Sequence, residues 1–270
     1  MRLAFVWYWD KASETYPNWR DGLRAAMELI AKRHEVVWFF DKQVPDPNEH
    51  WDGIIFWDDS NSAFFNLLDQ YDCPKTLCLT TDPQNFDNLR KLSAVYCEST
   101  PIYNAVRSQG IRAIKAFGTD TMFFTATDSK KDLPYFYPAT FSPWKLQSKI
   151  AHLGSQLTCI GTVQPDGQGE LAECLRNGVN VEQGYFPAWK IRSYYRRAQR
   201  VIIPAIHGSE RTILEAMACN ILPEVINVEN TRAKSYIREY HLSGSRSPRQ
   251  FVVSNYSASK YAKNIMKGFE

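Results

Sequence analysis

Short apolar runs alternate along this chain with segments in which the apolar residues recur every three or four positions. The first run covers residues 2–9 and predicts a buried strand. The apolar residues of the next segment share one helical face: Trp19, Leu23, Ala26, Met27 and Ile30. Asn18 is placed to cap that helix, with Asp21 in its first turn. A second strand over 35–40 completes a strand–helix–strand unit, which is typical of a parallel sheet.

The same alternation continues in two series. Further strands of the first series are predicted at 53–57, 76–80, 94–97 and 113–117, with helical patterns after most of them. Strands of the second series are predicted at 135–140, 157–161, 179–184, 200–204 and 222–226. Its helices are predicted at 144–153, 168–177, 188–198, 210–219 and 229–239, and a last helix at 257–268. Near-continuous apolar strands that alternate with helices predict an α/β fold with doubly wound parallel sheets.

A polar stretch over 125–134 separates the two series and is the expected hinge. The sequence therefore predicts a first Rossmann-like αβα domain over 1–124 and a second over 135–256. The segment 257–270 is expected to return to the first domain as a helix. Domains of this kind bind ligands at the carboxyl ends of their strands, and we expect the two to face each other across a cleft.

Composition narrows the functional classes. The 270 residues are 44% hydrophobic and 23% charged, which suits a soluble protein with a substantial core. A net charge of +3 does not by itself indicate a nucleic-acid partner. No run approaches the roughly 20 apolar residues of a membrane span, and the N-terminus is charged too early for a signal peptide. The 6 cysteines lack Cys-x-x-Cys and zinc spacings, which predicts reduced, buried thiols in a cytoplasmic protein.

The transition from the strand at 200–204 to the helix at 210–219 carries candidate chemistry. Ser209 is predicted to cap the helix, which leaves the N–H groups of Glu210, Arg211 and Thr212 free to bind an anion such as phosphate. Arg211 adds a permanent cation, and Glu215 could accept two hydroxyl groups of a ribose. The alternative is that Ser209 is only a cap and Glu215 a solvated charge.

A second helix start is similar. Ser142 and Pro143 are predicted to open a helix, with Lys145 in its first turn. A lysine opposes the helix dipole at that place, which suggests a bound anion. The alternative is an ordinary exposed lysine.

Several segments together resemble the retaining GT-B glycosyltransferases, the family called glycosyl transferases group 1. The sequence EAMAC from Glu215 resembles the second half of the family's Glu-x₇-Glu motif. Residues 184–198 resemble its glycine-containing loop and following helix, and FSPWK over 141–145 resembles the segment with its phosphate-binding lysine. In the first half, RHEV over 33–36 and FGTDTMFF over 117–124 resemble the family's Gly-His-Glu-Val and Gly-Val-Asp segments.

The resemblance implies a GT-B fold and a role for each matching residue. Lys145 and the helix start, from Gly208 to Thr212, would hold the pyrophosphate of a UDP- or GDP-sugar, and Glu215 would bind its ribose. Tyr185 and Phe186 would lie near the base, and Gly118 and Asp120 would approach the cleft from the hinge.

Two positions depart from the family pattern. His207 replaces the first glutamate of the motif, so it could bind sugar hydroxyls but carries no fixed negative charge. Thr140 stands near where the family has an arginine. A structural histidine is the alternative at 207.

The expected reaction is sugar transfer to a hydroxyl, with retention implied by the family alone. No Asp-x-Asp occurs in the chain, so a metal-bound pyrophosphate has no obvious ligands and no cofactor is expected beyond the donor sugar. Cationic side chains and helix dipoles would then stabilise the leaving group.

The acceptor is expected on the first domain, where Asp82 could act as a weak base or could simply cap a turn. Basic stretches over 190–200 and 232–249 would suit a nucleic-acid backbone, or are solvated helix faces. The compact chain resembles phage-type transferases that glycosylate hydroxymethylated pyrimidines in DNA. A saccharide or small metabolite is an equally open acceptor. Alternatives on the same architecture are a sugar-nucleotide epimerase, a phosphorylase, or a non-catalytic binding protein.

Overall fold

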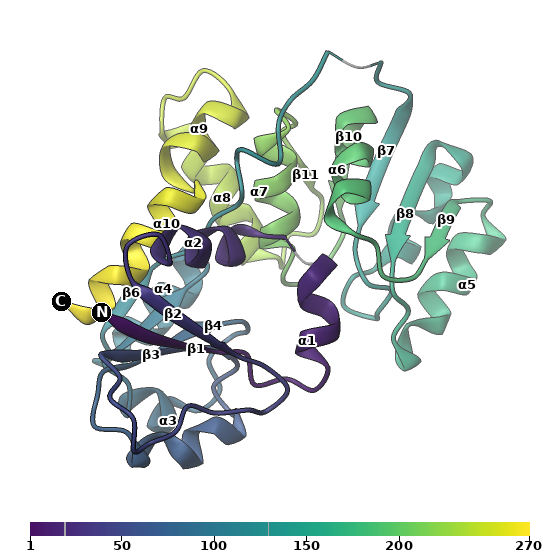
Figure 1. Ribbon diagram of the computed structural model, residues 1–270. Coiled ribbons are helices and arrows are strands. Elements are labelled where there is room, and N and C mark those ends of the chain that lie inside the picture. The colour runs from purple at the N-terminus through teal and green to yellow at the C-terminus, as the bar shows by residue number, and fades with distance from the viewer. Residues whose placement is uncertain (19, 129) are drawn as a thin grey trace. The chain divides into compact units, whose positions relative to one another are not determined.

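The structure is a computed structural model that describes residues 1–18, 20–128 and 130–270, without the side chain of Asn18. The predicted cap at Asn18 and the predicted packing of Trp19 therefore lie outside the described residues. The chain forms two compact units, Met1–Gly118 with Ser257–Glu270, and Thr119–Tyr256. Each is an α/β unit built on a parallel sheet (Figure 1).

The first unit contains a six-stranded sheet in the order β2-β1-β3-β4-β5-β6. Its strands are β1 (Arg2–Val6), β2 (Glu35–Phe39), β3 (Gly53–Asp58), β4 (Lys75–Leu79), β5 (Ala94–Cys97) and β6 (Ala113–Lys115). All neighbouring strands are parallel, with Ala4 opposite both Val37 and Ile54. The strands are mostly buried because helices cover both faces of the sheet, as the near-continuous apolar runs predict.

One face of this sheet packs against α2 (Gly22–Ile30) and α10 (Ala258–Met266). The other face packs against η2 (Ala63–Gln70), α3 (Phe86–Arg90) and α4 (Thr100–Ser108). Short helices α1 (Ala12–Thr15) and η1 (Tyr16–Asn18) precede α2. The residue that caps α2 is Asp21, whose side chain accepts from Leu23 N and Arg24 N. Asp21 was predicted inside the first turn, and the apolar face that starts at Leu23 is confirmed.

The C-terminal segment belongs to the first unit. Helix α10 lies beside α2, where the yellow end of the chain meets the purple beginning in Figure 1. Tyr96 of β5 donates to the Ile265 carbonyl at 2.5 Å, and Tyr261 and Ile265 are buried against the sheet. The last turn, η5 (Lys267–Phe269), places Gly268 directly against the Tyr96 ring, where a Cβ atom would collide with the hydroxyl. This segment is therefore part of the core of that unit.

The second unit contains a five-stranded parallel sheet in the order β11-β10-β7-β8-β9. Its strands are β7 (Leu133–Pro138), β8 (Leu157–Gly161), β9 (Asn180–Gln183), β10 (Ala198–Ile203) and β11 (Glu224–Val225). Its helices are η3 (Gln147–Gln156), η4 (Pro165–Gly167), α5 (Gln168–Arg176), α6 (Ala188–Arg197), α7 (Glu210–Ala218), α8 (Thr231–Leu242) and α9 (Pro248–Asn255). The predicted strands and helices of this series are present, and α9 is an additional helix.

The structure divides the chain at Gly118, whereas the sequence placed the end of the first domain at 124 and a hinge over 125–134. Residues 119–124 belong to the second unit because Arg249 of α9 holds them. Its guanidinium donates to the carbonyls of Thr121 at 3.1 Å, Phe124 at 3.0 Å and Ala218 at 2.6 Å. The described residues of 125–132 precede β7 within the second unit, so the polarity of this stretch did not mark the division between the units.

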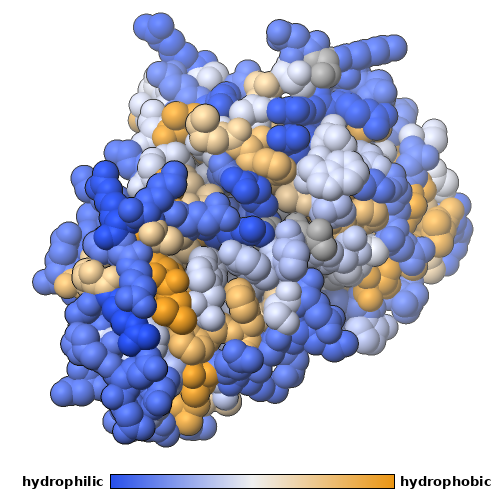
Figure 2. Space-filling model, viewed as in Figure 1, coloured by the Kyte–Doolittle hydropathy of each residue, from blue (hydrophilic) through white to orange (hydrophobic). Residues whose placement is uncertain are grey.

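Figure 2 shows hydrophilic side chains over most of the visible face, with hydrophobic ones in separate small patches. Within the described ranges, no helix has the length and hydrophobicity needed to span a bilayer. The cysteines are free thiols; five are buried, and Cys73 is half-buried.

Candidate functional site

The second sheet has a topological switch point between β7 and β10. From β7 the chain proceeds to β8 and β9 on one side, and then returns to β10 and β11 on the other. The loops that follow β7 and β10 therefore leave neighbouring strand ends in opposite directions. Ligands of doubly wound sheets bind in the crevice that such a divergence creates. The residues predicted to hold a pyrophosphate lie on these two loops.

Lys145 and Ser209 meet at this switch point. The Lys145 ammonium lies 3.4 Å from Ser209 Oγ. It also lies over Gly208, where an added Cβ atom would be 2.9 Å from Nζ. The two loops are joined by a backbone hydrogen bond from Ile206 N to the Trp144 carbonyl at 2.9 Å, and Tyr137 donates to the Lys145 carbonyl at 3.3 Å. The cation is thus held at the amino end of α7.

The local structure around Lys145 differs from the prediction. Residues 142–145 form a turn, closed by Lys145 N and the Ser142 carbonyl at 2.9 Å, and Leu146 has a left-handed backbone with φ 53°. The helix, η3, begins only at Gln147 and has 3₁₀ geometry. The prediction that Ser142 and Pro143 open a helix with Lys145 in its first turn is wrong. The dipole that Lys145 meets is that of α7, whose amino end attracts anions and repels a bare cation.

Ser209 occupies the N-cap position of α7, but its side chain makes no capping hydrogen bond. Its backbone is left-handed, with φ 75°, and follows Gly208 at φ 74°. The predicted side-chain cap is therefore wrong, because a cap residue normally has an extended backbone that aims its oxygen at the helix. The N–H groups of Glu210, Arg211 and Thr212 keep the amino-end positions that have no acceptor within a helix.

Two residues that the sequence did not assign to this site, Asn230 and Arg232, fix this helix start. Asn230 caps α8 through Ala233 N, and its amide donates to the carbonyls of Ala205 at 3.1 Å and Gly208 at 3.2 Å. Arg232 forms a buried ion pair with Glu210, and the two residues are 7% and 4% exposed. The Glu210 carboxylate is therefore neutralised inside the protein, which reduces its repulsion of an anion at the helix start. An Asn before a helix signals a cap, but it does not reveal the carbonyls that its amide reaches.

Glu215 and Thr212 lie on the inner side of α7. Glu215 is only 6% exposed, so it is not a solvated charge, and its Oε1 lies 4.0 Å from Arg211 Nε. Burial, to which the Glu215 charge adds, raises the pKa of Tyr195 well above its ordinary value. The Thr212 hydroxyl donates to the Pro138 carbonyl at 3.3 Å, so this side chain ties α7 to the end of β7.

Thr140 and His207 lie on the same two loops as Lys145 and Ser209. The Thr140 hydroxyl is 3.1 Å from that of Thr162, and its carbonyl accepts from Gln147 Nε2 at 2.9 Å. His207 is exposed, and its ring stacks on Trp144 with centroids 6.1 Å apart and planes inclined by 12°. Exposure is compatible with a sugar contact, and stacking on Trp144 is compatible with a structural role, so both interpretations of His207 stand.

Comparisons with known proteins support the fold. No family model matches the chain, and none of the curated proteins matches it. Solved structures do match: AviGT4, a glycosyltransferase of avilamycin A biosynthesis, aligns over 100% of this chain and 97% of its own with a TM-score of 0.66 and 12% identity. The DNA-modifying β-glucosyltransferase aligns over 100% of both chains with a TM-score of 0.57 and 12% identity.

The chain has the GT-B fold. The N-terminal domain of a Candida albicans trehalose-6-phosphate phosphatase also aligns, over 100% of this chain and 98% of its own, with a TM-score of 0.65 and 8% identity. Identities this low establish architecture and leave the activity to be argued from the site.

The remaining predicted residues of this GT-B protein belong to other elements than the two loops that carry Lys145 and Ser209. Tyr185 and Phe186 follow β9, which is separated from β7 by β8. Tyr185 is 53% exposed, and the ammonium of Lys190 lies 4.5 Å from the Phe186 ring centre. Gly118 and Asp82 belong to the first unit, where Asp82 is exposed in the loop after β4. Asp120 is buried, and its Oδ1 accepts from the backbone N–H groups of Met122 and Phe123, each at 3.1 Å.

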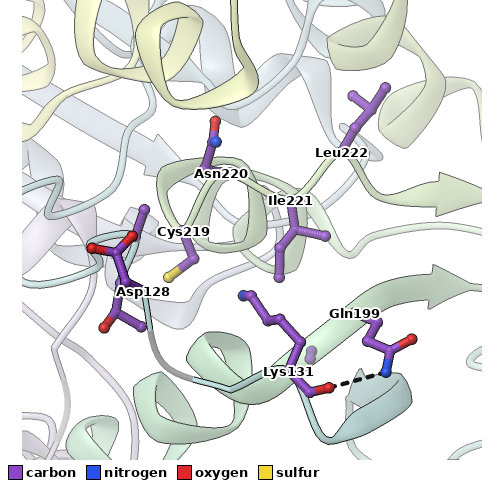
Figure 3. A pocket seen from close by; sticks show the side chains of 10 residues that line it. Asp128, Lys131, Gln199, Cys219, Asn220, Ile221 and Leu222 are labelled. Atoms are coloured by element: carbon purple, nitrogen blue, oxygen red, sulfur yellow. Dashed lines mark hydrogen bonds between the residues drawn. The ribbon is translucent and has the colours of Figure 1, made fainter.

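The second unit also contains a hollow of about 500 Å³, which is lined by the amino end of β10 and the carboxyl end of α7. In Figure 3 the Lys131 side chain points toward Cys219, and the Lys131 carbonyl accepts from Gln199 at 3.0 Å. Burial lowers the pKa of Lys131 there. Because this hollow adjoins the start of β10, it is distinct from the switch point at the strand's end. Among the described residues, no group of three or more His, Cys, Asp and Glu side chains could hold a metal ion.

Proposed function

We propose that this protein transfers a sugar from a nucleoside diphosphate sugar to the hydroxyl group of an acceptor. The observation that carries the proposal is the position of the Lys145 ammonium over Gly208 and Ser209, at the amino end of α7. A cation and a helix amino end that meet at a switch point are matched to a dianionic group such as a pyrophosphate.

The proposed chemistry follows from that charge arrangement. The bond between the anomeric carbon and the diphosphate breaks, a bond to the acceptor oxygen forms, and the acceptor proton leaves. Negative charge grows on the diphosphate as its bond breaks, so Lys145 and the N–H groups at the start of α7 stabilise the transition state more than the bound donor. The buried Glu215 accepts hydroxyl groups of the donor ribose, and the exposed His207 contacts the sugar. Retention of configuration rests on the family resemblance.

Two of the matching structures support this reaction. AviGT4 is a glycosyltransferase, and the structure of the DNA-modifying β-glucosyltransferase was determined with and without its substrate uridine diphosphoglucose. We therefore propose UDP-sugars as the first donors to test and GDP-sugars as the second.

A hydroxymethylated pyrimidine in DNA is one acceptor class, supported by the likeness to the DNA-modifying enzyme. The predicted basic stretches support it weakly, because many of their cations are engaged within the second unit. Lys190 pairs with Glu182, Arg197 with Asp132, and Arg232 with Glu210. A protein binds a nucleic-acid backbone through cations that displace small counterions from the phosphates. Cations that already pair with carboxylates are less suited to this role. A hydroxyl group of a saccharide or metabolite is the other acceptor class.

The test is turnover of UDP- and GDP-sugars labelled in the sugar, with no acceptor, with saccharides, and with duplex DNA that contains hydroxymethylated pyrimidines. Label that moves to an acceptor supports the proposal. A changed sugar on the same nucleotide would indicate an epimerase, and phosphate-dependent release of sugar phosphate would indicate a phosphorylase. Donor binding without any turnover would indicate a binding protein and would refute the proposed transfer.

A further inference from the structure

The first sheet also has a switch point, and tryptophan rings surround it. The chain leaves β1 toward β2 on one side and later enters β3 on the other. Trp9 follows β1, and Trp57 is near the end of β3. Their rings stack with centroids 4.8 Å apart and planes inclined by 27°. Trp7, which is buried, closes the group with its ring centre 4.7 Å from that of Trp57.

Trp9 is held in place and is nevertheless open to solvent. Its indole N–H donates to Asp58 Oδ1 at 2.9 Å, and Asp58 is only 8% exposed. The same oxygen accepts from Asp59 N at 2.8 Å. With both ring contact and hydrogen bond in place, Trp9 remains 40% exposed. A large apolar ring that is fixed in one orientation while facing water is a pre-formed surface for the flat side of a ligand.

The loops around this indole platform, formed by Trp9 and Trp57, are cross-linked. Asp10 pairs with Lys42 at 2.9 Å, and Ser13 N donates to Asp41 Oδ1 at 3.1 Å. Lys11, Asp41 and Lys42 all have left-handed backbones, with φ of 60°, 54° and 61°. Left-handed non-glycine residues carry strain that the surroundings must maintain, and such strain gathers at functional sites.

The charges next to the platform favour one class of occupant. These charged residues stand near the carboxyl ends of β2, β1 and β3: Asp41, Lys42, Asp10, Lys11, Asp58 and Asp59. Carboxylates exceed ammonium groups, so a phosphate backbone is repelled at this surface. Carboxylates only accept hydrogen bonds, and each offers about four lone-pair sites. They therefore match the hydroxyl groups of a sugar, whose C–H face packs on an indole ring.

We propose that the indole platform binds the ring of an uncharged saccharide, which is the acceptor of the transfer proposed above. Only the role of this saccharide as the acceptor rests on the proposed function, because saccharide binding can occur and be measured without turnover. The Trp9 ring stacks on the sugar, and Asp58 keeps the indole in position. Neighbouring carboxylates accept hydrogen bonds from the hydroxyl groups of the sugar. A nucleic-acid acceptor is the competing outcome of the test.

The experiment is calorimetric titration of the full chain with uncharged methyl glycosides of glucose, galactose and mannose, with cellobiose and maltose, and with duplex DNA that contains 5-hydroxymethylcytosine. At least one saccharide binds the unchanged protein. Trp9→Ala weakens its binding about tenfold or more, whereas Trp9→Phe keeps most of the affinity because a ring remains. Trp189→Ala removes another exposed indole, 61% exposed in α6, and leaves saccharide affinity unchanged.

Three results overturn the inference: no saccharide of the set binds, Trp9→Ala binds it as well as the unchanged protein, or DNA binds in a Trp9-dependent manner while the saccharides do not. Circular dichroism and the melting temperature of each variant exclude loss of the fold as the cause. Titration with UDP separates the two proposals. Trp9-dependent saccharide binding without UDP binding refutes only the donor site, and UDP binding with donor turnover but without a Trp9 effect refutes only the platform.

Discussion

Removal of the Lys145 ammonium is the most direct test of the donor site. Two unit charges about 4 Å apart attract by about 4 kcal/mol at an effective dielectric constant of about 20. Desolvation and side-chain ordering reduce this, and hydrogen bonds to charged groups contribute about 1.5–3 kcal/mol net. Lys145→Ala is therefore expected to raise the Kd for UDP roughly 10- to 150-fold. Circular dichroism and the melting temperature of the variant check that its fold persists.

The assay is calorimetric titration with UDP at low and at high salt. Lys149→Ala is the matched control, since Lys149 is exposed on η3 four positions further on. Its Kd should equal that of the unchanged protein. Because exposed charges are screened by salt and half-buried ones less so, the effect of Lys145→Ala should shrink only in part as salt increases. A Lys145→Ala protein that binds UDP with unchanged affinity would refute the assignment of a diphosphate to this switch point.

Other substitutions test the scaffold and the sugar contact. Asn230→Ala removes a cap and leaves two carbonyls unpaired, so the free energy of unfolding should fall by about 1–3 kcal/mol in denaturant titration, with weaker UDP binding. Gly161→Ala places a Cβ atom against the Ala139 carbonyl and should lower the free energy of unfolding by about 1–3 kcal/mol. In Gly169→Ala the added Cβ meets nothing within 4 Å, so the free energy of unfolding should change little. Equal losses in the two variants would contradict the packing around Gly161. Hydrogen bonds from Lys190 and Tyr194 lower the pKa of Glu182 from its ordinary 4.5. These hydrogen bonds stabilise the folded protein at a pH above 4.5, and their contribution is lost as the pH falls through the lower pKa of Glu182 in the folded state. The difference in melting temperature between the unchanged protein and Glu182→Gln should therefore disappear as the pH is lowered. His207→Ala should lower turnover more than UDP affinity, and unchanged kinetics would assign the ring to stacking on Trp144.

Most elements of the fold could be predicted because the central strands, such as β1, β3, β4, β5 and β8, are short apolar runs that are largely buried. Strand β3 shows this well, since Gly53–Asp58 is almost entirely buried and its apolar sequence has no competing helical period. The helix at 144–153 was predicted less well. Leu146 takes a left-handed backbone that nothing in its residue type signals, so the chain turns at Lys145 before η3 begins.

The candidate site was predictable in its members and less so in its geometry. Lys145 and Ser209 are 64 positions apart, and their approach follows from the adjacency of β7 and β10. The sequence indicates that both strands exist, but not that they are neighbours. The two hydrogen bonds from the Asn230 amide are still harder to predict from the sequence, because they depend on where the carbonyls of Ala205 and Gly208 point. Asp120 shows a further limit of motif reading: its Oδ1 accepts from two backbone N–H groups, which the motif does not reveal, and its predicted place near the cleft stays a prediction.

The place of α10 in the first unit has a consequence for biosynthesis. The second unit, Thr119–Tyr256, is continuous in the chain, so it can complete its contacts as soon as α9 has left the ribosome. The first unit is translated earlier but lacks Tyr261, Ile265 and Gly268 until the segment Ser257–Glu270 has been translated. Its sheet must wait, with the part of the face that α10 will cover still uncovered, while the second unit folds ahead of it. Nascent chains stalled before Ser257 should therefore expose that part of the face to chaperones, although strands β1 to β6 have already been made.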